Sequence, residues 1–402
     1  MPVPMVERRT LRPVALVLLL LICSVLPVAL FAPSAHAFTP SIVTTVAVGH
    51  SPQAIAYDSG KGEIFVANSA SSSVSVISDT TDAVVATIPV GSGPAGVAYD
   101  SGKGEVFVTD LNDGNVSIIS DSSNAVVATL KVGSAPSGLA YDSAQSEVFV
   151  ANNNAGTVSV ISDASNTVVK TIGAGNSPNG VAYDSGKGEV FVTSSSTVSV
   201  IDDSNNSVIG TVTVGTGPQG IAYDSAQGQV YVANLDVASV SVISDANSAV
   251  LTTIPVGSKP SSIAYDPNTS NLIVANSLGG SISIISDAVN PPVANSTIGM
   301  TVNPTGIAYD AAKGELFISS SAAGTVTILA DGSKPVTLPS TSTSEASTTV
   351  TAPPTTTVVT QTASGGGGVD INTVIIAAAV LIGFIFIGIQ LQRRGKSRES
   401  AD

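Results

Sequence analysis

The sequence predicts an all-β fold, a seven-bladed β-propeller, on two observations. The tripeptide Ala-Tyr-Asp recurs at spacings of 42, 42, 42, 40, 42 and 44 residues, with its tyrosines at Tyr57, Tyr99, Tyr141, Tyr183, Tyr223, Tyr265 and Tyr309. Each repeat also contains four short runs rich in Val and Ile, separated by turns rich in Gly, Ser, Asn and Asp. Four strands in a repeat of this length are typical of a propeller blade, and seven such repeats make a ring.

Two further positions fix the register of the repeat. A proline stands five residues before each of these tyrosines. Eight residues after each tyrosine stands a large apolar or aromatic residue: Phe65, Phe107, Phe149, Phe191, Tyr231, Ile273 or Phe317. In the second repeat we expect strands at 95–99, 105–109, 115–120 and 125–132. Their apolar runs are nearly continuous, or alternate with serine, which predicts strands packed on both faces.

The two ends of the repeat region predict how the ring closes. After the strand expected at 325–329 no fourth strand follows, because a Ser/Thr-rich stretch begins. The run SIVTTVAVG at 41–49 instead matches AVVATIPVG at 83–91, the fourth strand of the first repeat. We therefore expect residues 41–48 to complete the last blade, which removes exposed sheet edges. The short run 336–338 is the alternative.

Two irregular spacings predict two irregular loops. The interval from the repeat tyrosine to the aspartate that follows the third strand is two residues shorter in the fourth repeat than in the others. This difference predicts a shortened loop near 194–197. The interval from the aspartate after the third strand of the sixth repeat to the tyrosine of the seventh is two residues longer than the corresponding interval elsewhere. We expect that insertion within 290–302, where Pro291 and Pro292 would disturb the fourth strand.

Residues 1–37 have the three parts of a secretory signal peptide. A basic start that includes Arg8 and Arg9 precedes the apolar run 14–32, and Ala-His-Ala at 35–37 gives a small-x-small cleavage site. Because the apolar run is long, an uncleaved membrane anchor is the alternative.

Three segments are expected after the propeller domain, which spans 38–335. A Ser/Thr/Pro/Gly-rich stalk covers 336–370, because this composition offers too little apolar surface to fold. Residues 371–391 hold only three polar side chains and are long enough to cross the membrane as one helix. The basic tail 392–402 marks the cytoplasmic side. We therefore expect a single-pass type I protein of the plasma membrane with an extracellular propeller.

Composition excludes several classes of chemistry. Cys23 is the only cysteine, and it lies with His36 in the predicted signal peptide, so the mature chain would keep only His50, in a turn. Disulfide scaffolds, Cys/His zinc sites and thiol nucleophiles are thereby excluded. Between residues 38 and 371 there are 26 acids, eight lysines and no arginine, so nucleic acid is not an expected partner. We predict no catalytic residue, no cofactor and no metal ligand, and hence no enzyme.

Aspartates occupy two fixed turn positions in each repeat, and the alternating strand direction places both turns on one face. The first position gives Asp58, Asp100, Asp142, Asp184, Asp224, Asp266 and Asp310, and the second gives Asp79, Asp121, Asp163, Asp203, Asp245, Asp287 and Asp331. Four lysines offset them: Lys61, Lys103, Lys187 and Lys313. We expect these aspartates to cap tight turns through their side chains, so that acid weakens the fold, with cation binding as the alternative.

The opposite face carries the Gly-Ser-x-Pro loops and the loops that follow each second strand. The latter differ between repeats (SASSS, LNDGN, NNAGT, SSST, LDVAS, SLGGS and SAAGT), whereas the strands repeat. A binding surface is expected where equal units vary, although loop tips are also free to drift. Four glycosylation sequons, at Asn115, Asn205, Asn268 and Asn295, are about as many as chance provides.

Four runs recur in the repeats: x-Pro-x-Gly-Ile/Val-Ala-Tyr-Asp, Val-Phe-Val-Ala-Asn, Val-Ser-Val-Ile-Ser-Asp and Val-Val-Ala-Thr-Ile-Pro-Val-Gly, as at 94–100, 148–152, 74–79 and 84–91. They resemble the YVTN-type β-propeller repeats of microbial surface-layer and related exported proteins, over about three quarters of the chain. The resemblance implies the fold, while members of that family have many functions. With its signal peptide, Thr-rich stalk and C-terminal span, the chain resembles an archaeal surface protein in particular.

These expectations favour a non-enzymatic, membrane-anchored cell-surface module that interacts with a surface protein or a glycan. Two alternatives remain. One is an exported propeller enzyme, a lyase or hydrolase acting on a surface polymer, and the other is a purely structural component of a surface lattice.

Overall fold

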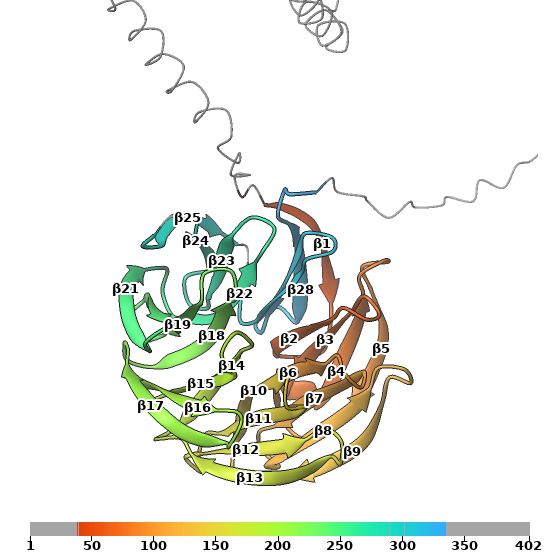
Figure 1. Cartoon of the computed structure of the whole chain (residues 1–402). Helices are drawn as coiled ribbons and strands as arrows, with labels where there is room; N and C mark the ends of the chain where they lie inside the picture. Colours follow the sequence, from red (N-terminus) through yellow and green to blue (C-terminus); the bar gives the residue numbers. More distant parts are fainter. Residues whose placement is uncertain (1–37, 39, 289, 301, 335–402) are drawn as a thin grey trace, which may run out of the picture. The chain divides into compact units, whose positions relative to one another are not determined.

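The computed structural model describes residues 38, 40–288, 290–300 and 302–334. Within them it contains 28 β-strands in seven four-stranded sheets, and one 3₁₀ helix, η1 (Ser69–Ser71). The sheets are arranged radially around one axis, as blades of a propeller (Figure 1). The seven-bladed propeller is therefore confirmed. The predicted signal peptide, stalk, span and tail lie outside the described residues, among which no helix is long and apolar enough to cross a membrane.

Each blade is an antiparallel meander that starts nearest the axis. The inner strands are β2 (Pro52–Asp58), β6 (Pro94–Asp100), β10 (Pro136–Asp142), β14 (Pro178–Asp184), β18 (Pro218–Asp224), β22 (Pro260–Asp266) and β26 (Ile307–Asp310). The second strands are β3 (Glu63–Asn68), β7 (Glu105–Asp110), β11 (Glu147–Asn152), β15 (Glu189–Ser194), β19 (Gln229–Asn234), β23 (Asn271–Asn276) and β27 (Glu315–Ser320). The third strands are β4 (Ser73–Ser78), β8 (Asn115–Ser120), β12 (Thr157–Ser162), β16 (Thr197–Asp202), β20 (Ser239–Ser244), β24 (Ser281–Ser286) and β28 (Thr325–Ala330). The outer strands are β5 (Ala83–Pro89), β9 (Ala125–Lys131), β13 (Thr167–Gly173), β17 (Ser207–Thr213), β21 (Ala249–Pro255), β25 (Val293–Gly299) and β1 (Ser41–Ala47).

The hydrophobic core lies between neighbouring blades, in seven clusters that correspond to the seven blade junctions. At the junction of blade 1 (β2–β5) and blade 2 (β6–β9), Phe65 and Val76 of the former pack with Val106 and Val108 of the latter, and all four are fully buried. Fully burying one such side chain contributes roughly 1.5–3 kcal/mol. The continuous apolar runs of the second and third strands are thus explained, because their side chains contact a neighbouring blade on both sides.

The outer strands are mostly exposed, with at most one buried residue in each. In blades 1–6 each outer strand carries a bulge opposite the third strand, for example where Val76 pairs with Ala86 and Ile77 with Val84. The extra residue there, Val85, is 52% exposed. Such bulges twist an edge strand and hinder its pairing with another chain.

The ring is closed by the N-terminal strand. β1 pairs antiparallel with β28, from Ser41 opposite Ala330 to Ala47 opposite Thr325, and Figure 1 shows the two strands side by side. Blade 7 therefore combines β26–β28 with β1. The predicted closure by residues 41–48 is confirmed. The fourth-strand position of blade 7, which the alternative assigned to 336–338, is occupied by β1.

Both irregular spacings map to single loops. In blade 4 only two residues, Ser195 and Ser196, join β15 to β16, as expected. In blade 6 the two extra residues lie in the connection between Ser286, the end of β24, and Val293, the start of β25. The expected disturbance of the fourth strand is wrong, because Pro291 and Pro292 precede β25, which keeps seven residues and the usual bulge.

Candidate functional site

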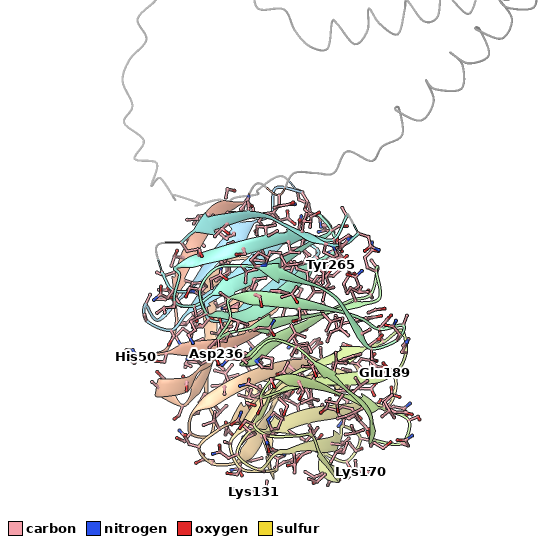
Figure 2. The ribbon with its side chains drawn as sticks, turned by 90° about the vertical axis from the view of Figure 1, so that its left-hand side faces the viewer. His50, Lys131, Lys170, Glu189, Asp236 and Tyr265 are labelled. Atoms are coloured by element: carbon pink, nitrogen blue, oxygen red, sulfur yellow. The ribbon has the colours of Figure 1, made fainter. Side chains whose placement is uncertain are left out.

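The ring has two faces of different chemistry. The turns from first to second strand and from third to fourth strand form the acidic face, which holds the repeated aspartates. The Gly-Ser-x-Pro loops and the loops from second to third strand form the other, which we call the pocket face. Figure 2 views the ring from its side, with His50 and Asp236 on the pocket face and Glu189 and Tyr265 toward the acidic face.

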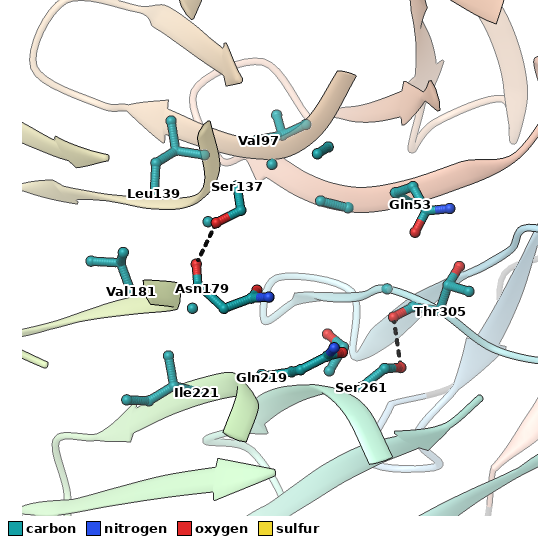
Figure 3. A pocket seen from close by; sticks show the side chains of 18 of the residues that line it. Gln53, Val97, Ser137, Leu139, Asn179, Val181, Gln219, Ile221, Ser261 and Thr305 are labelled. Carbon is teal, nitrogen blue, oxygen red and sulfur yellow. Dashed lines mark hydrogen bonds between the residues drawn. The ribbon is translucent and has the colours of Figure 1, made fainter. Parts of the chain in front are cut away.

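A cavity of about 520 Å³ lies on the axis at the pocket face. All seven blades contribute to it through the residues that follow the repeated proline, and Figure 3 shows them converging from their separate strands. Its polar side chains come from Gln53, Ser137, Asn179, Gln219, Ser261, Ser262, Ser277 and Thr305. The cavity has the size of an ordinary small-molecule site.

Glycines at the second position after the proline allow the inner strands to converge. A Cβ built on Gly180 would lie 2.1 Å from the main-chain oxygen of Gln219 in the next blade. Equivalent clashes would occur at Gly96, 2.2 Å from the oxygen of Ser137, and at Gly138, 2.4 Å from that of Asn179. Since no backbone can yield so far without moving a strand, these glycines set the width of the axial cavity.

Hydrogen bonds between blades hold part of the lining in place. Ser137 Oγ donates to the main-chain oxygen of Asn179, and Ser261 Oγ to that of Thr305, each at 3.1 Å (Figure 3). By contrast, the side-chain amides of Asn179 and Gln219 make no hydrogen bond within the described part of the chain. Both are half-buried, so they present donors and acceptors to the cavity.

None of the lining residues carries a charge. Beneath the polar groups lie the aliphatic side chains of Val97, Leu139, Val181, Ile221 and Ile263. Amides and hydroxyls over an aliphatic base can hydrogen-bond hydroxyl or amide groups of an uncharged ligand, and they offer no counter-ion to an anion or a cation.

The variable loops surround this cavity. Leu111 and Leu235 line it; Val237, on the loop of Leu235, is 51% exposed, and Leu278, next to the lining residue Ser277, is 68% exposed. His50 is exposed on this face with its main-chain N–H donating to Ser71 Oγ at 2.7 Å, and it is not among the lining residues. The binding surface expected at the variable loops therefore surrounds the axial cavity, and His50 does not line that cavity.

On the acidic face the first aspartate of every blade caps its own turn. Asp58 Oδ1 accepts the main-chain N–H groups of Gly60 at 2.8 Å and Lys61 at 3.2 Å. The other six first-position aspartates make the same pair of bonds. The predicted capping role is confirmed at these seven positions.

The second aspartates serve instead to join blades. The repeat tyrosine lies between the second aspartate of its own blade and the first aspartate of the preceding blade, so that Tyr57 donates to Asp79 at 3.2 Å and also neighbours Asp310. Where the turn holds a lysine, its ammonium crosses the same junction: Lys103 Nζ donates to the main-chain oxygen of Asp163 at 2.5 Å. The sequence predicted neither contact between blades.

Burial raises the pKa of several acids on this face. It brings the pKa of Glu315 to about 7, and burial together with the neighbouring Asp224 brings the pKa of Asp287 to about 7. The pKa values of Asp163 and Asp203 are raised, again chiefly by burial. For Asp163, Asp203 and Asp287 the expectation that acid weakens the fold is wrong, because a carboxyl with a raised pKa stabilises the folded state when it is protonated.

Two further expectations concern attached groups. Among the residues that the structure describes, no group of three or more His, Cys, Asp and Glu side chains is placed to hold a metal ion. Of the four sequons, Asn268 is engaged across a junction, donating to Tyr309 Oη at 2.7 Å and to the main-chain oxygen of Ala311 at 2.9 Å. A glycan there would break both bonds.

The cavity residues were not predicted from the sequence. Their signal was present, since the residue directly after the repeated proline differs in most blades: Gln53, Ala95, Ser137, Asn179, Gln219, Ser261 and Thr305. Variation in the loops does not reveal these residues, because the position after the proline lies inside a strand.

Comparisons with known proteins bear on the fold. No protein-family model matches the sequence, and no curated protein matches it. Among solved structures, a chain of hydrazine synthase from Kuenenia stuttgartiensis is similar with a TM-score of 0.63 and 15% sequence identity. The match covers 74% of this chain and 98% of that chain. At this identity the likeness supports the propeller fold alone.

Proposed function

We propose that this seven-bladed propeller is a non-enzymatic binding module, of the YVTN-repeat type, that holds an uncharged, hydroxyl-rich group such as a terminal sugar of a surface glycan in its axial cavity. The signal peptide at 1–37 and the span at 371–391 would export the chain and anchor it, so that the propeller stands outside the cell on its stalk.

The neutral lining of the cavity is the observation that carries this proposal. Asn179 and Gln219 offer unengaged amide groups there, and their blades are adjacent, so one ligand can reach both. Sugar hydroxyls both donate and accept hydrogen bonds, which suits amides and serine hydroxyls better than charged groups. The aliphatic residues below them can contact the apolar face of a ring.

Chemistry on a surface polymer is the less favoured function. Hydrolases and lyases need a general acid or base, or a nucleophile activated by one, within hydrogen-bond reach of the reacting atoms. The residues lining the cavity include none of the charged or imidazole side chains that would serve. The exposed Val237 and Leu278 favour additional contact with the molecule that bears the glycan.

Binding of the purified full-length chain to an array of neutral and acidic oligosaccharides tests the proposal. We expect neutral glycans to bind and the double variant Asn179→Ala, Gln219→Ala to lose at least tenfold in affinity. Gln145→Ala, which removes an amide from a turn on the acidic face, is the matched control and should bind as the parent does. Preference for acidic glycans, or equal binding by the double variant, would contradict the proposal.

A further inference from the structure

At each blade junction of the acidic face two carboxylates must be neutralised or hydrogen-bonded, and the groups that do so differ between junctions. Two aspartates, the first of one blade and the second of the next, lie close together where little water reaches them. At four junctions a lysine is the counter-ion: the ammonium groups of Lys61, Lys103, Lys187 and Lys313 donate to the main-chain oxygens of Asp121, Asp163, Asp245 and Asp79. Lys313 Nζ also lies 3.7 Å from Asp79 Oδ1.

The junction between blades 6 and 7 has no such lysine and is satisfied by hydrogen bonds. Thr269 Oγ1 donates to Asp266, and Tyr309 Oη donates to Asp331 Oδ2 at 2.6 Å. The main-chain N–H of Ser333 donates to Asp331 Oδ1 at 2.6 Å. At the junction of blades 3 and 4, which also lacks the lysine, Tyr183 donates to Asp203 at 3.4 Å.

The junction between blades 5 and 6 has no lysine, and Tyr265 lies close to both of its carboxyls without a hydrogen bond of ordinary length to either. Gln227 replaces the lysine of the turn, and Asp224 and Asp287 face each other across the junction. Asp224 is fully buried and Asp287 is 3% exposed. Three of their carboxylate oxygens are buried without a hydrogen-bond partner in the described part of the chain: both of Asp287, and Asp224 Oδ2, which shares this state with the Oδ2 of five other first-position aspartates.

Asp287 differs in this respect from its six equivalents. It is the only second-position aspartate among the described residues in which both oxygens are buried and unpaired. The other titratable groups acting on the pair are Tyr231 and Tyr265, which bring no positive charge. Two facing carboxylates in such a place repel each other unless one of them is protonated or a positive charge lies between them.

We infer that a hard metal cation of the calcium type binds between Asp224 and Asp287, in the place that a lysine ammonium takes at the equivalent junctions. The ligands would be the three unpaired carboxylate oxygens and the main-chain oxygen of Asp287, whose equivalents at the other junctions accept a lysine. Gln227 at the lysine position and the hydroxyl of Tyr265 offer further neutral oxygens.

The chemistry of these atoms selects the kind of ion. All are oxygens, two residues carry negative charge, and neither sulfur nor imidazole is present, which favours calcium over transition metals. Because the two carboxylates belong to different blades, the ion would fasten blade 5 to blade 6 and would stabilise only the folded ring. This inference concerns the acidic face and does not depend on the proposed function of the cavity.

Thermal unfolding of the full-length chain at pH 8, followed by circular dichroism, tests the inference. The chain is first stripped with chelator, and calcium chloride is then added at constant ionic strength. We expect a saturable rise in Tm, of about 5 °C at a hundredfold excess over Kd, and one ion per chain by calorimetric titration.

Two variants should remove this response. Asp287→Asn deletes a ligand. Gln227→Lys restores the lysine of the other junctions, so its metal-free Tm should exceed that of the metal-free parent while calcium adds nothing. Asp121→Asn, at the same position of a junction that has its lysine, is the matched control and should keep the full response.

Other outcomes would overturn the inference. A Tm that ignores calcium at pH 8 but falls between pH 6 and pH 8, in the parent and not in Asp287→Asn, would show that the pair shares a proton instead. A calcium response that survives in both Asp287→Asn and Gln227→Lys would place the ion elsewhere. If Asp287→Asn does not fold, the behaviour of Gln227→Lys decides.

Discussion

The acidic face and the pocket face are built from the same repeat, yet they diverged in opposite ways. On the acidic face all fourteen turn aspartates are present, and the first of each blade makes the same pair of capping bonds. On the pocket face the residue after the proline ranges from Ala95 to Gln219, and the loops differ in length and content.

The difference indicates which constraint acts on each face. Every acidic turn must cap its own backbone and meet the next blade, so its two aspartates are kept in all seven blades, although the lysine position varies. The axial positions face a cavity, where a change costs little packing and alters the surface offered to a ligand. Repetition therefore marks the structural face of this ring, and variation marks the candidate binding face.

Deleting residues 41–48 should have the largest effect, because it abolishes both faces together. Blade 7 would lose β1 and expose the edge of β28, and Val46 would leave the core that joins blade 7 to blade 1. We expect aggregation or rapid proteolysis, measured by size-exclusion chromatography and limited trypsin digestion. Ile42→Thr, at a side chain 66% exposed in the same strand, is the control and should elute as the parent does. A deletion variant that elutes and melts like the parent would refute this closure.

Gly180→Ala should selectively damage the pocket face. Its Cβ would meet the main-chain oxygen of Gln219 at 2.1 Å, so the inner strands of blades 4 and 5 must separate. We expect a loss of about 3 kcal/mol, seen as a fall in Tm of about 5 °C or more, together with weaker ligand binding. Gly173→Ala, which has no atom within 4 Å of its Cβ, should leave Tm within about 1 °C. Equal effects of the two substitutions would show that the axial glycines do not set the cavity.

Asp110→Asn should have the smallest effect and a stabilising one. Asp110 stands at the pocket-face end of β7, where four other blades have asparagine, and burial raises its pKa to about 6. A carboxyl whose folded pKa is raised contributes stability below its unfolded pKa of about 4 and loses that contribution as pH rises through about 6. Asparagine avoids the loss and can donate to Ser117, as Asn152 donates to Ser159 at 2.9 Å.

Urea unfolding of parent and Asp110→Asn across pH 4 to 8 measures this effect. We expect a gain of about 1–2 kcal/mol at pH 8 that shrinks toward zero near pH 4. Asp113→Asn, on the exposed loop two residues beyond Leu111, is the comparison: its carboxylate accepts the main-chain N–H of Ser92 at 2.7 Å, which an amide oxygen can also accept, so stability at pH 8 should change much less than in Asp110→Asn. A destabilised Asp110→Asn at pH 8 would mean that the carboxylate has a partner that favours its charge.

Much of the architecture could be predicted because the same sequence pattern occurs in all seven repeats. Seven tyrosines in register gave the number of blades, and the match between 41–49 and 83–91 gave the closure. The shortened loop at Ser195 and Ser196 followed from counting residues. Counting could not place the insertion of blade 6 relative to β25, since two prolines are compatible with a turn and with a bent strand alike.

The candidate sites were harder to predict because they are formed by residues of different blades. That each first aspartate caps its turn is a local property, and turn chemistry predicted it. That Lys103 reaches Asp163, or that Asn179 and Gln219 share a cavity, depends on how adjacent blades are oriented. Residues 40 to 60 positions apart in sequence become neighbours there without any local pattern to mark them.

By itself, the sequence determined the strand pattern, the seven repeats and the segregation of aspartates to one face, because strand alternation and turn chemistry act over a few residues. Only the tertiary structure decided the environment of those aspartates. Burial between blades raises the pKa of Asp287 to about 7, although its turn has the same Ser-Asp pair as the turn of Asp79. The reason is that desolvation and charge depend on what surrounds a group in space, and in a ring each blade supplies those surroundings for the next.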